Sequence, residues 1–127
     1  MSAVHSHVIA WFEIPSTNFH RAVRFYETIL GTTFRREDAG QPMAIFNYGE
    51  QATGGCITGG NTMKPSAEGT LVYLNAEPTV NAVLARVEEA GGKVQGPAIR
   101  LPNDIGYIAF FTDTEGNRIG LHSQHND

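Results

Sequence analysis

The stretch STNFHRAVRFYETILGTTF, residues 16–34, decides the fold that this sequence predicts. Apolar side chains recur in it at helical spacing and would form one stripe: Ala22, Phe25, Tyr26, Ile29 and Leu30. Asn18 or Thr17 can cap the start of the helix, and Gly31 can take the left-handed conformation that ends it. The stretch therefore predicts one amphipathic helix with its own start and stop signals.

The same unit recurs in the second half of the chain as TVNAVLARVEEAGGKV, residues 79–94. Ala82 then matches Ala22, and Gly91 matches Gly31. An apolar, strand-like run precedes each helix, at residues 8–14 and 70–74. Three further strands follow each helix, at 32–36, 43–48 and 56–59 in the first half and near 94, 106–112 and 118–122 in the second. The chain reads as one β-α-β-β-β unit made twice.

Two such units predict an α+β fold, because each has one sheet face covered by its helix and one left bare. We expect a curved mixed sheet of about eight strands around a concave cleft, with the helices outside. The 127 residues suit a single domain, 1–127. Module one spans about 6–60, a Gly- and Pro-containing linker about 60–69, and module two about 70–124.

Composition excludes several classes of protein. The net charge of −4 provides no basic field, which argues against a nucleic-acid or acidic-membrane partner. No apolar run approaches the length of about 20 residues that a membrane span needs. A single cysteine, Cys56, fits a reducing compartment, so we expect the cytoplasm.

Three segments carry a family resemblance: WFEIPSTNFHRAVRFYETILG, a second copy ending in EEAGGKV, and the closing DTEGNRIGLHS. Together they resemble the vicinal oxygen chelate superfamily, which contains glyoxalase I, extradiol dioxygenases, and fosfomycin- and bleomycin-resistance proteins. The likeness runs from about Val8 to Ser123. It implies paired βαβββ modules, a homodimer, and enzymes that use a divalent metal in the concave cleft.

The resemblance also implies where metal ligands would lie, on the first and last strand of each module. In this sequence those positions are Trp11, Thr58, Leu71 and Gly120. None supplies the carboxylate or imidazole that a divalent ion prefers, and shifting each position by one residue brings in no better donor. We therefore predict no metal site and no cofactor. His5 and His7 alternate and could chelate an ion, or they could be a terminal pair with no ligand.

Strand alternation selects the side chains expected to line the cleft. They are Trp11, Glu13, Tyr73, Asn75, Tyr107, Phe111 and His122. Glu13 and His122 are the candidate catalytic acid and base, and the other five are candidate ligand-binding residues. Alternatives stay open for three of them. Trp11 could be core, His122 could be an exposed strand end, and Glu13 could pair with an arginine (Arg21, Arg100 or Arg118) as structure.

Three functions follow as hypotheses. The first is a metal-independent protein that binds a small molecule in the cleft, similar to the bleomycin-resistance proteins. The second is a metal-dependent lyase, isomerase or dioxygenase resembling glyoxalase I. The third is a metal-free enzyme with Glu13 as general base. We expect Asp113 and Asn117 to act structurally in their turn, and Cys56 to be a buried thiol.

Overall fold

The computed structural model describes residues 8–60 and 63–126, so His5 and His7 lie outside the described residues. The two halves repeat one order of elements, as the sequence predicts. The first half holds β1 (Trp11–Pro15), α1 (Phe19–Leu30), β2 (Arg35–Asp38), β3 (Pro42–Ile45) and β4 (Gly54–Thr58). The second holds β5 (Tyr73–Asn75), α2 (Val80–Val87), β6 (Lys93–Val94), β7 (Ile99–Leu101), β8 (Gly106–Thr112) and β9 (Arg118–Ser123).

Both helices begin on a side-chain cap, and α1 also ends on a glycine. The Asn18 side chain accepts a hydrogen bond from the Arg21 backbone N–H at 3.1 Å, and Gly31 ends α1 with a φ of 63°. The Thr79 hydroxyl caps α2 in the same way, accepting from the Ala82 N–H at 3.1 Å. The Asn18 cap and the Gly31 stop confirm the predicted boundaries of the helix of module one. No helix of the described residues is long and apolar enough to cross a bilayer.

The strands form two sheets, which confirms the two βαβββ modules but differs from one continuous sheet. The order is β1-β4-β3-β2 in the first sheet and β5-β9-β8-β6 in the second. In the first sheet β1 pairs in parallel with β4, and in the second β5 pairs in parallel with β9. β7 was not predicted, because its segment carries two prolines. It pairs with β8 as an additional strand of the second sheet.

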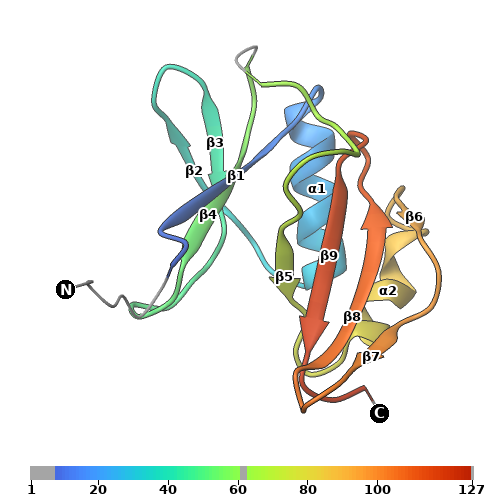
Figure 1. Cartoon of the computed structure of the whole chain (residues 1–127). Helices are drawn as coiled ribbons and strands as arrows, with labels where there is room; N and C mark the ends of the chain where they lie inside the picture. Colours follow the sequence, from blue (N-terminus) through green and yellow to red (C-terminus); the bar gives the residue numbers. More distant parts are fainter. Residues whose placement is uncertain (1–7, 61–62, 127) are drawn as a thin grey trace.

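Helix α1 contributes to the core of both halves. The Tyr26 ring of α1 lies 6.2 Å from Phe46 of the first module, and the neighbouring Phe25 ring lies 5.7 Å from Phe111 of the second. The second sheet lies in front of both helices in Figure 1, and the first sheet stands beside α1. Each sheet therefore has an inner face on the helices and an outer face turned away from them.

The turn between β8 and β9 ties the second module to α1. The Tyr26 hydroxyl donates to Asp113 Oδ2 at 2.6 Å, and the Asp113 carboxylate also accepts the backbone N–H groups of Glu115 and Asn117. The structural role expected for Asp113 and Asn117 is thus confirmed.

Glu115 in the same turn caps α1. Its carboxylate accepts the backbone N–H groups of Thr17 and Asn18 at 2.9 and 2.8 Å and pairs with Arg21 at 2.8 Å. Burial alone would raise the pKa of Glu115, but the hydrogen bonds from Arg21, Asn18 and Thr114 outweigh it and lower that pKa to about 2. A charged turn of module two therefore holds the helix of module one.

Candidate functional site

The outer face of the first sheet carries the two residues predicted for it. Trp11 is 38% exposed and Glu13 is exposed, whereas the alternating Phe12 packs at 5.3 Å on Phe46 and Ile14 is buried. The strand therefore turns Trp11 and Glu13 away from the helix, as alternation predicts.

The outer face of the second sheet carries Tyr73, Asn75 and His122, also as predicted. The strand register pairs Tyr73 with Gly120 and Asn75 with His122. The Tyr73 ring covers Gly120 so closely that a Cβ on Gly120 would lie 2.5 Å from the ring carbon Cδ2. Tyr73 remains 44% exposed, so its ring is an accessible aromatic surface.

The predicted cleft positions of Phe111 and Tyr107 are wrong. Phe111 is fully buried and its ring contacts Phe25 of α1, and Tyr107 packs against the same core. The register explains the error, because Phe111 pairs with Ile119, whose side chain also faces the helices. Tyr107 and Phe111 therefore belong to the inner face.

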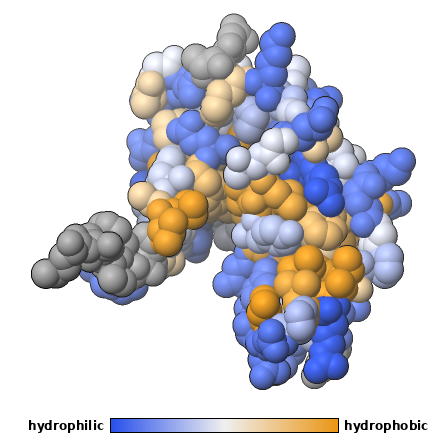
Figure 2. Space-filling view, in the orientation of Figure 1, coloured by the Kyte–Doolittle hydropathy of each residue, from blue (hydrophilic) through white to orange (hydrophobic). Residues whose placement is uncertain are grey.

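The residues that take their place are Ile108, Phe110 and Arg118, which sequence reasoning missed. Phe110 pairs with Gly120 across the ladder and its ring lies 5.8 Å from the Tyr73 ring. The Arg118 guanidinium carbon lies 4.4 Å above the Phe110 ring, a cation–π contact. Figure 2 shows hydrophobic side chains gathered on this face, over β8 and β9.

Charged residues from both sheets meet in one small cavity. It measures about 160 Å³ and is lined by Glu13 of β1, Arg118 of β9, and Lys64, Ser66 and Glu68 of the linker. Within residues 8–60 and 63–126, Glu13 has no ion pair within 4.0 Å, which leaves the predicted structural pairing with an arginine without support. This cavity lies between β1, β9 and the linker.

His122 is engaged elsewhere. Its Nε2 lies 2.6 Å from the Ile105 carbonyl oxygen, and because a carbonyl only accepts, Nε2 carries the hydrogen. Arg118 lines the charged cavity with Glu13, and His122 lies four residues further along β9, about 13 Å at the rise of a strand. The structure therefore does not bring Glu13 and His122 together as an acid–base pair. Their catalytic roles stay a prediction.

Cys56 lies beside Glu13 in the ladder and is fully buried. Burial first, and the charge of Glu13 second, raise the pKa of the Cys56 thiol to about 11. A protonated, buried thiol is a poor nucleophile, which agrees with the expected structural role.

The positions that the family resemblance assigns to a metal do not fit one. Trp11 offers no acceptor lone pair, the Thr58 hydroxyl is buried, and the space beside Gly120 is filled by the Tyr73 ring. Leu71 precedes β5 and carries no donor. Among the described residues, no group of three or more His, Cys, Asp or Glu could hold a metal ion.

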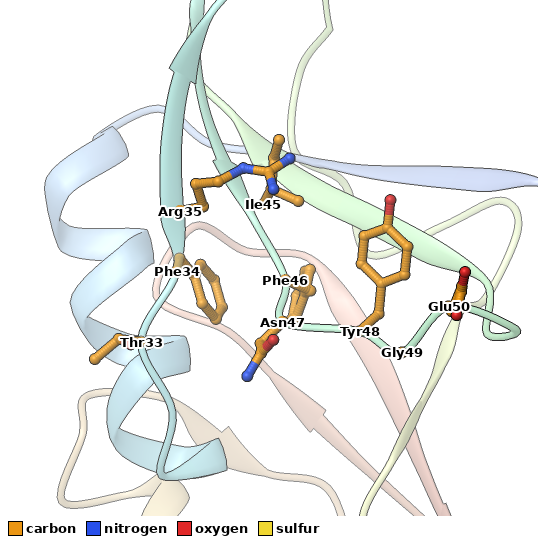
Figure 3. Close-up of a pocket in the computed structure, with 9 residues that line it drawn as sticks. All are labelled: Thr33, Phe34, Arg35, Ile45, Phe46, Asn47, Tyr48, Gly49 and Glu50. Atoms are coloured by element: carbon orange, nitrogen blue, oxygen red, sulfur yellow. The ribbon is translucent and has the colours of Figure 1, made fainter.

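A second, larger cavity of about 550 Å³ opens in the first module (Figure 3). The β2–β3 ladder ends at the pair Arg35–Ile45, and beyond it the chain segments 33–34 and 46–50 line the opening. None of the predicted site residues lines this cavity, although Tyr48 at its rim contacts Trp11 edge-to-face at 6.2 Å.

Comparison with known proteins supports the fold seen here. A structure described as a glyoxalase/bleomycin resistance protein from Albidiferax ferrireducens matches 95% of this chain and all of its own, with a TM-score of 0.72 at 18% identity. A glyoxalase I mutant from Zea mays matches 91% of this chain with a TM-score of 0.68 at 20% identity, and this chain spans 46% of it. These likenesses concern the fold alone.

Sequence comparison gives the family. A glyoxylase-like domain-containing protein from Didymella fabae is 29% identical over 113 residues, which cover 86% of this chain and 88% of that protein. The family model described as Glyoxalase/Bleomycin resistance protein/Dioxygenase superfamily matches residues 8–121. With paired βαβββ modules and a match over nearly its whole length, the chain belongs to the Glyoxalase/Bleomycin resistance protein/Dioxygenase superfamily.

Proposed function

We propose that this protein binds a small, flat and partly apolar molecule on the outer faces of its sheets, and that it does so without the family metal. The observation that carries this proposal is the accessible aromatic surface formed by Tyr73 and Phe110, with Arg118 above the Phe110 ring. Aromatic faces next to a few charged groups are typical of small-molecule sites.

The aromatic ring over Gly120 supports the metal-free form of the proposal. A carboxylate at this position would have to displace the Tyr73 ring, because even a Cβ would lie 2.5 Å from it. The Tyr73 ring thus occupies the space that a metal-binding side chain at position 120 would need. Elemental analysis of protein purified without a histidine tag tests this directly, and one bound divalent ion per chain would refute it.

A homodimer is part of the proposal. Exposed aromatic side chains lie on both outer faces, with Trp11 at 38% and Tyr48 at 45% on the first sheet and Tyr73 at 44% on the second. Pairing the first sheet of one copy with the second sheet of another would cover these faces and enclose a deeper cleft. Light scattering after gel filtration measures the mass, and a monomer at micromolar concentration would contradict this arrangement.

The binding test uses the protein's own fluorophore. Trp11 is the single tryptophan and lies on an outer face, so a ligand there should change its emission. We expect a screen of aromatic small molecules to give saturable changes that Tyr73→Leu weakens. Tyr107→Leu is the matched control, because Tyr107 lies on the inner face. Saturable binding that is equally tight in both variants would place the site elsewhere.

The cytoplasmic location expected from the single free cysteine is retained as part of this proposal.

A further inference from the structure

The cavity between the modules carries charges of both signs on two kinds of support. Glu13 and Arg118 lie on strands, at the outer faces of β1 and β9. Lys64 and Glu68 lie on the linker, at equal distances along the chain from Ser66. The four side chains thus provide two carboxylates and two cations around about 160 Å³.

The linker is held in place against β9. The Ser66 backbone N–H donates to Asn117 Oδ1 at 3.1 Å, and the Ser66 carbonyl accepts from the Arg118 N–H at 3.4 Å. The Ser66 hydroxyl in turn accepts from the Glu68 N–H at 3.0 Å. These bonds hold the linker at Ser66 and Glu68 against β9, and Glu13 and Arg118 lie on strands.

The four charges are not joined to one another. In the described part of the chain, the ion pairs within 4.0 Å are Arg21–Glu115 and Arg35–Glu37, and neither involves the cavity. The Arg118 guanidinium is instead held over the Phe110 ring at 4.4 Å. Opposite charges that share one cavity without contact leave room for a group that contacts both.

We propose that this cavity binds a small zwitterion, with an ammonium group facing Glu13 and Glu68 and a carboxylate group facing Lys64 and Arg118. The four residues are exposed, so their charges are hydrated in the free protein. A ligand of one charge would be attracted by two of the side chains and repelled by the other two, whereas a zwitterion can be attracted by all four. This inference rests on the proposed small-molecule function and adds a ligand class to it: a molecule with an amino-acid-like end beside an apolar, flat part.

The test is a titration followed by ¹H–¹⁵N NMR, which suits weak binding and reports folding in the same spectrum. The probes are glycine, β-alanine and γ-aminobutyrate, compared at constant ionic strength with propionate and propylammonium. We expect at least one of the three zwitterions to shift the amide signals of Lys64, of residues 66–72, and of Arg118 and Ile119 in a saturable way. Each single-charge compound should bind at least about tenfold more weakly.

Substitutions separate this site from general charge effects. Glu13→Gln and Arg118→Gln should each weaken binding of the zwitterion at least about tenfold. Glu89→Gln and Arg100→Gln remove the same charges at exposed positions outside the cavity and should leave it unchanged. The double variant Glu13→Arg with Arg118→Glu exchanges the two charges. It should bind the zwitterion more tightly than Glu13→Arg alone or Arg118→Glu alone.

Three outcomes would overturn the inference: no saturable shift with any zwitterion, propionate binding as tightly as the zwitterions, or equal binding by Glu13→Gln and the wild type. Each of these leaves the aromatic site testable, because that site is probed by Trp11 emission and by Tyr73→Leu. If aromatic molecules bind and zwitterions do not, only the ligand class assigned to the cavity is wrong. If neither binds, the proposed function falls with it.

Discussion

Replacing Glu115 with glutamine should loosen the contact between the two modules without altering either sheet. The Glu115 carboxylate accepts the Thr17 and Asn18 backbone N–H groups and pairs with Arg21 through two bonds of 2.8 and 3.0 Å. Glutamine keeps one acceptor oxygen but removes the charge that the helix N-terminus and the guanidinium both favour. The substitution therefore isolates the electrostatic part of this contact.

The size of the effect follows from the pKa of Glu115, which is lowered from 4.5 to about 2. At about 1.36 kcal/mol for each pKa unit, a difference of about 2.5 units would correspond to about 3.4 kcal/mol if water did not screen the pair. The Glu115 side chain is fully covered, but the Arg21 side chain is 46% exposed, so solvent screening reduces the value. We expect a loss of about 1.5 to 2 kcal/mol in the free energy of unfolding.

The assay is urea denaturation of wild type and Glu115→Gln over a range of pH. Because the folded-state pKa of Glu115 lies below its ordinary value, its contribution is complete above pH about 4.5 and is lost as the pH falls through about 2. The difference between the two proteins should thus be largest at neutral pH and nearly vanish near pH 2. Glu89→Gln, an exposed carboxylate on the second half, is the control and should give no difference at either pH. A Glu115→Gln difference that is equal at neutral pH and at pH about 2 would refute the electrostatic explanation.

Three further predictions concern single contacts. Tyr26→Phe removes the 2.6 Å bond to the buried Asp113 carboxylate and should lower the free energy of unfolding by about 1 to 3 kcal/mol in urea denaturation. Unchanged stability would show that this bond is compensated. Gly120→Ala should cost about 1 to 3 kcal/mol, because its Cβ meets the Tyr73 ring. The cost should largely disappear in a Tyr73→Ala background, and an undiminished cost there would exclude the ring as its cause. The pKa of Cys56 near 11 in place of 9.0 should slow its reaction with a disulfide reagent at mildly alkaline pH about 100-fold relative to the protein in urea. Equal rates in both conditions would contradict a buried thiol.

The helices could be predicted from sequence because their signals are local. The apolar stripe of α1, the Asn18 cap and the Gly31 stop all lie within one stretch, and each was found where expected. The faces of β1 could be predicted for the same reason, since Trp11 and Glu13 alternate with the clearly apolar Phe12 and Ile14.

The faces of β8 could not be predicted from alternation alone, because both of its faces are apolar. Phe110 and Phe111 are adjacent and of equal hydrophobicity, so the pattern does not decide which one faces the helices. The hairpin register does decide it. Thr112 pairs with Arg118 across the turn, which places Phe111 opposite Ile119. Counting outward from the DTEGN turn would have assigned Phe111 to the inner face, and this signal was present in the sequence.

The spatial relation of the two sheets depends on contacts between distant residues, which periodicity does not report. The segment DTEGN, which helped to suggest the family, proves to be a structural device: Asp113 fixes Tyr26, and Glu115 caps α1. These bonds are made to α1, on the helix side of the sheets, whereas Tyr73, Phe110 and Arg118 lie on the opposite face. Substitutions on the outer faces can therefore change what is bound while the contact between modules is kept, which is how one fold can carry different chemistry. In this chain one segment holds residues of both kinds, since Asp113 and Glu115 fix the fold and Arg118, a few positions later, lies on the outer face. A family match therefore does not identify the ligand, which has to be inferred from the outer faces.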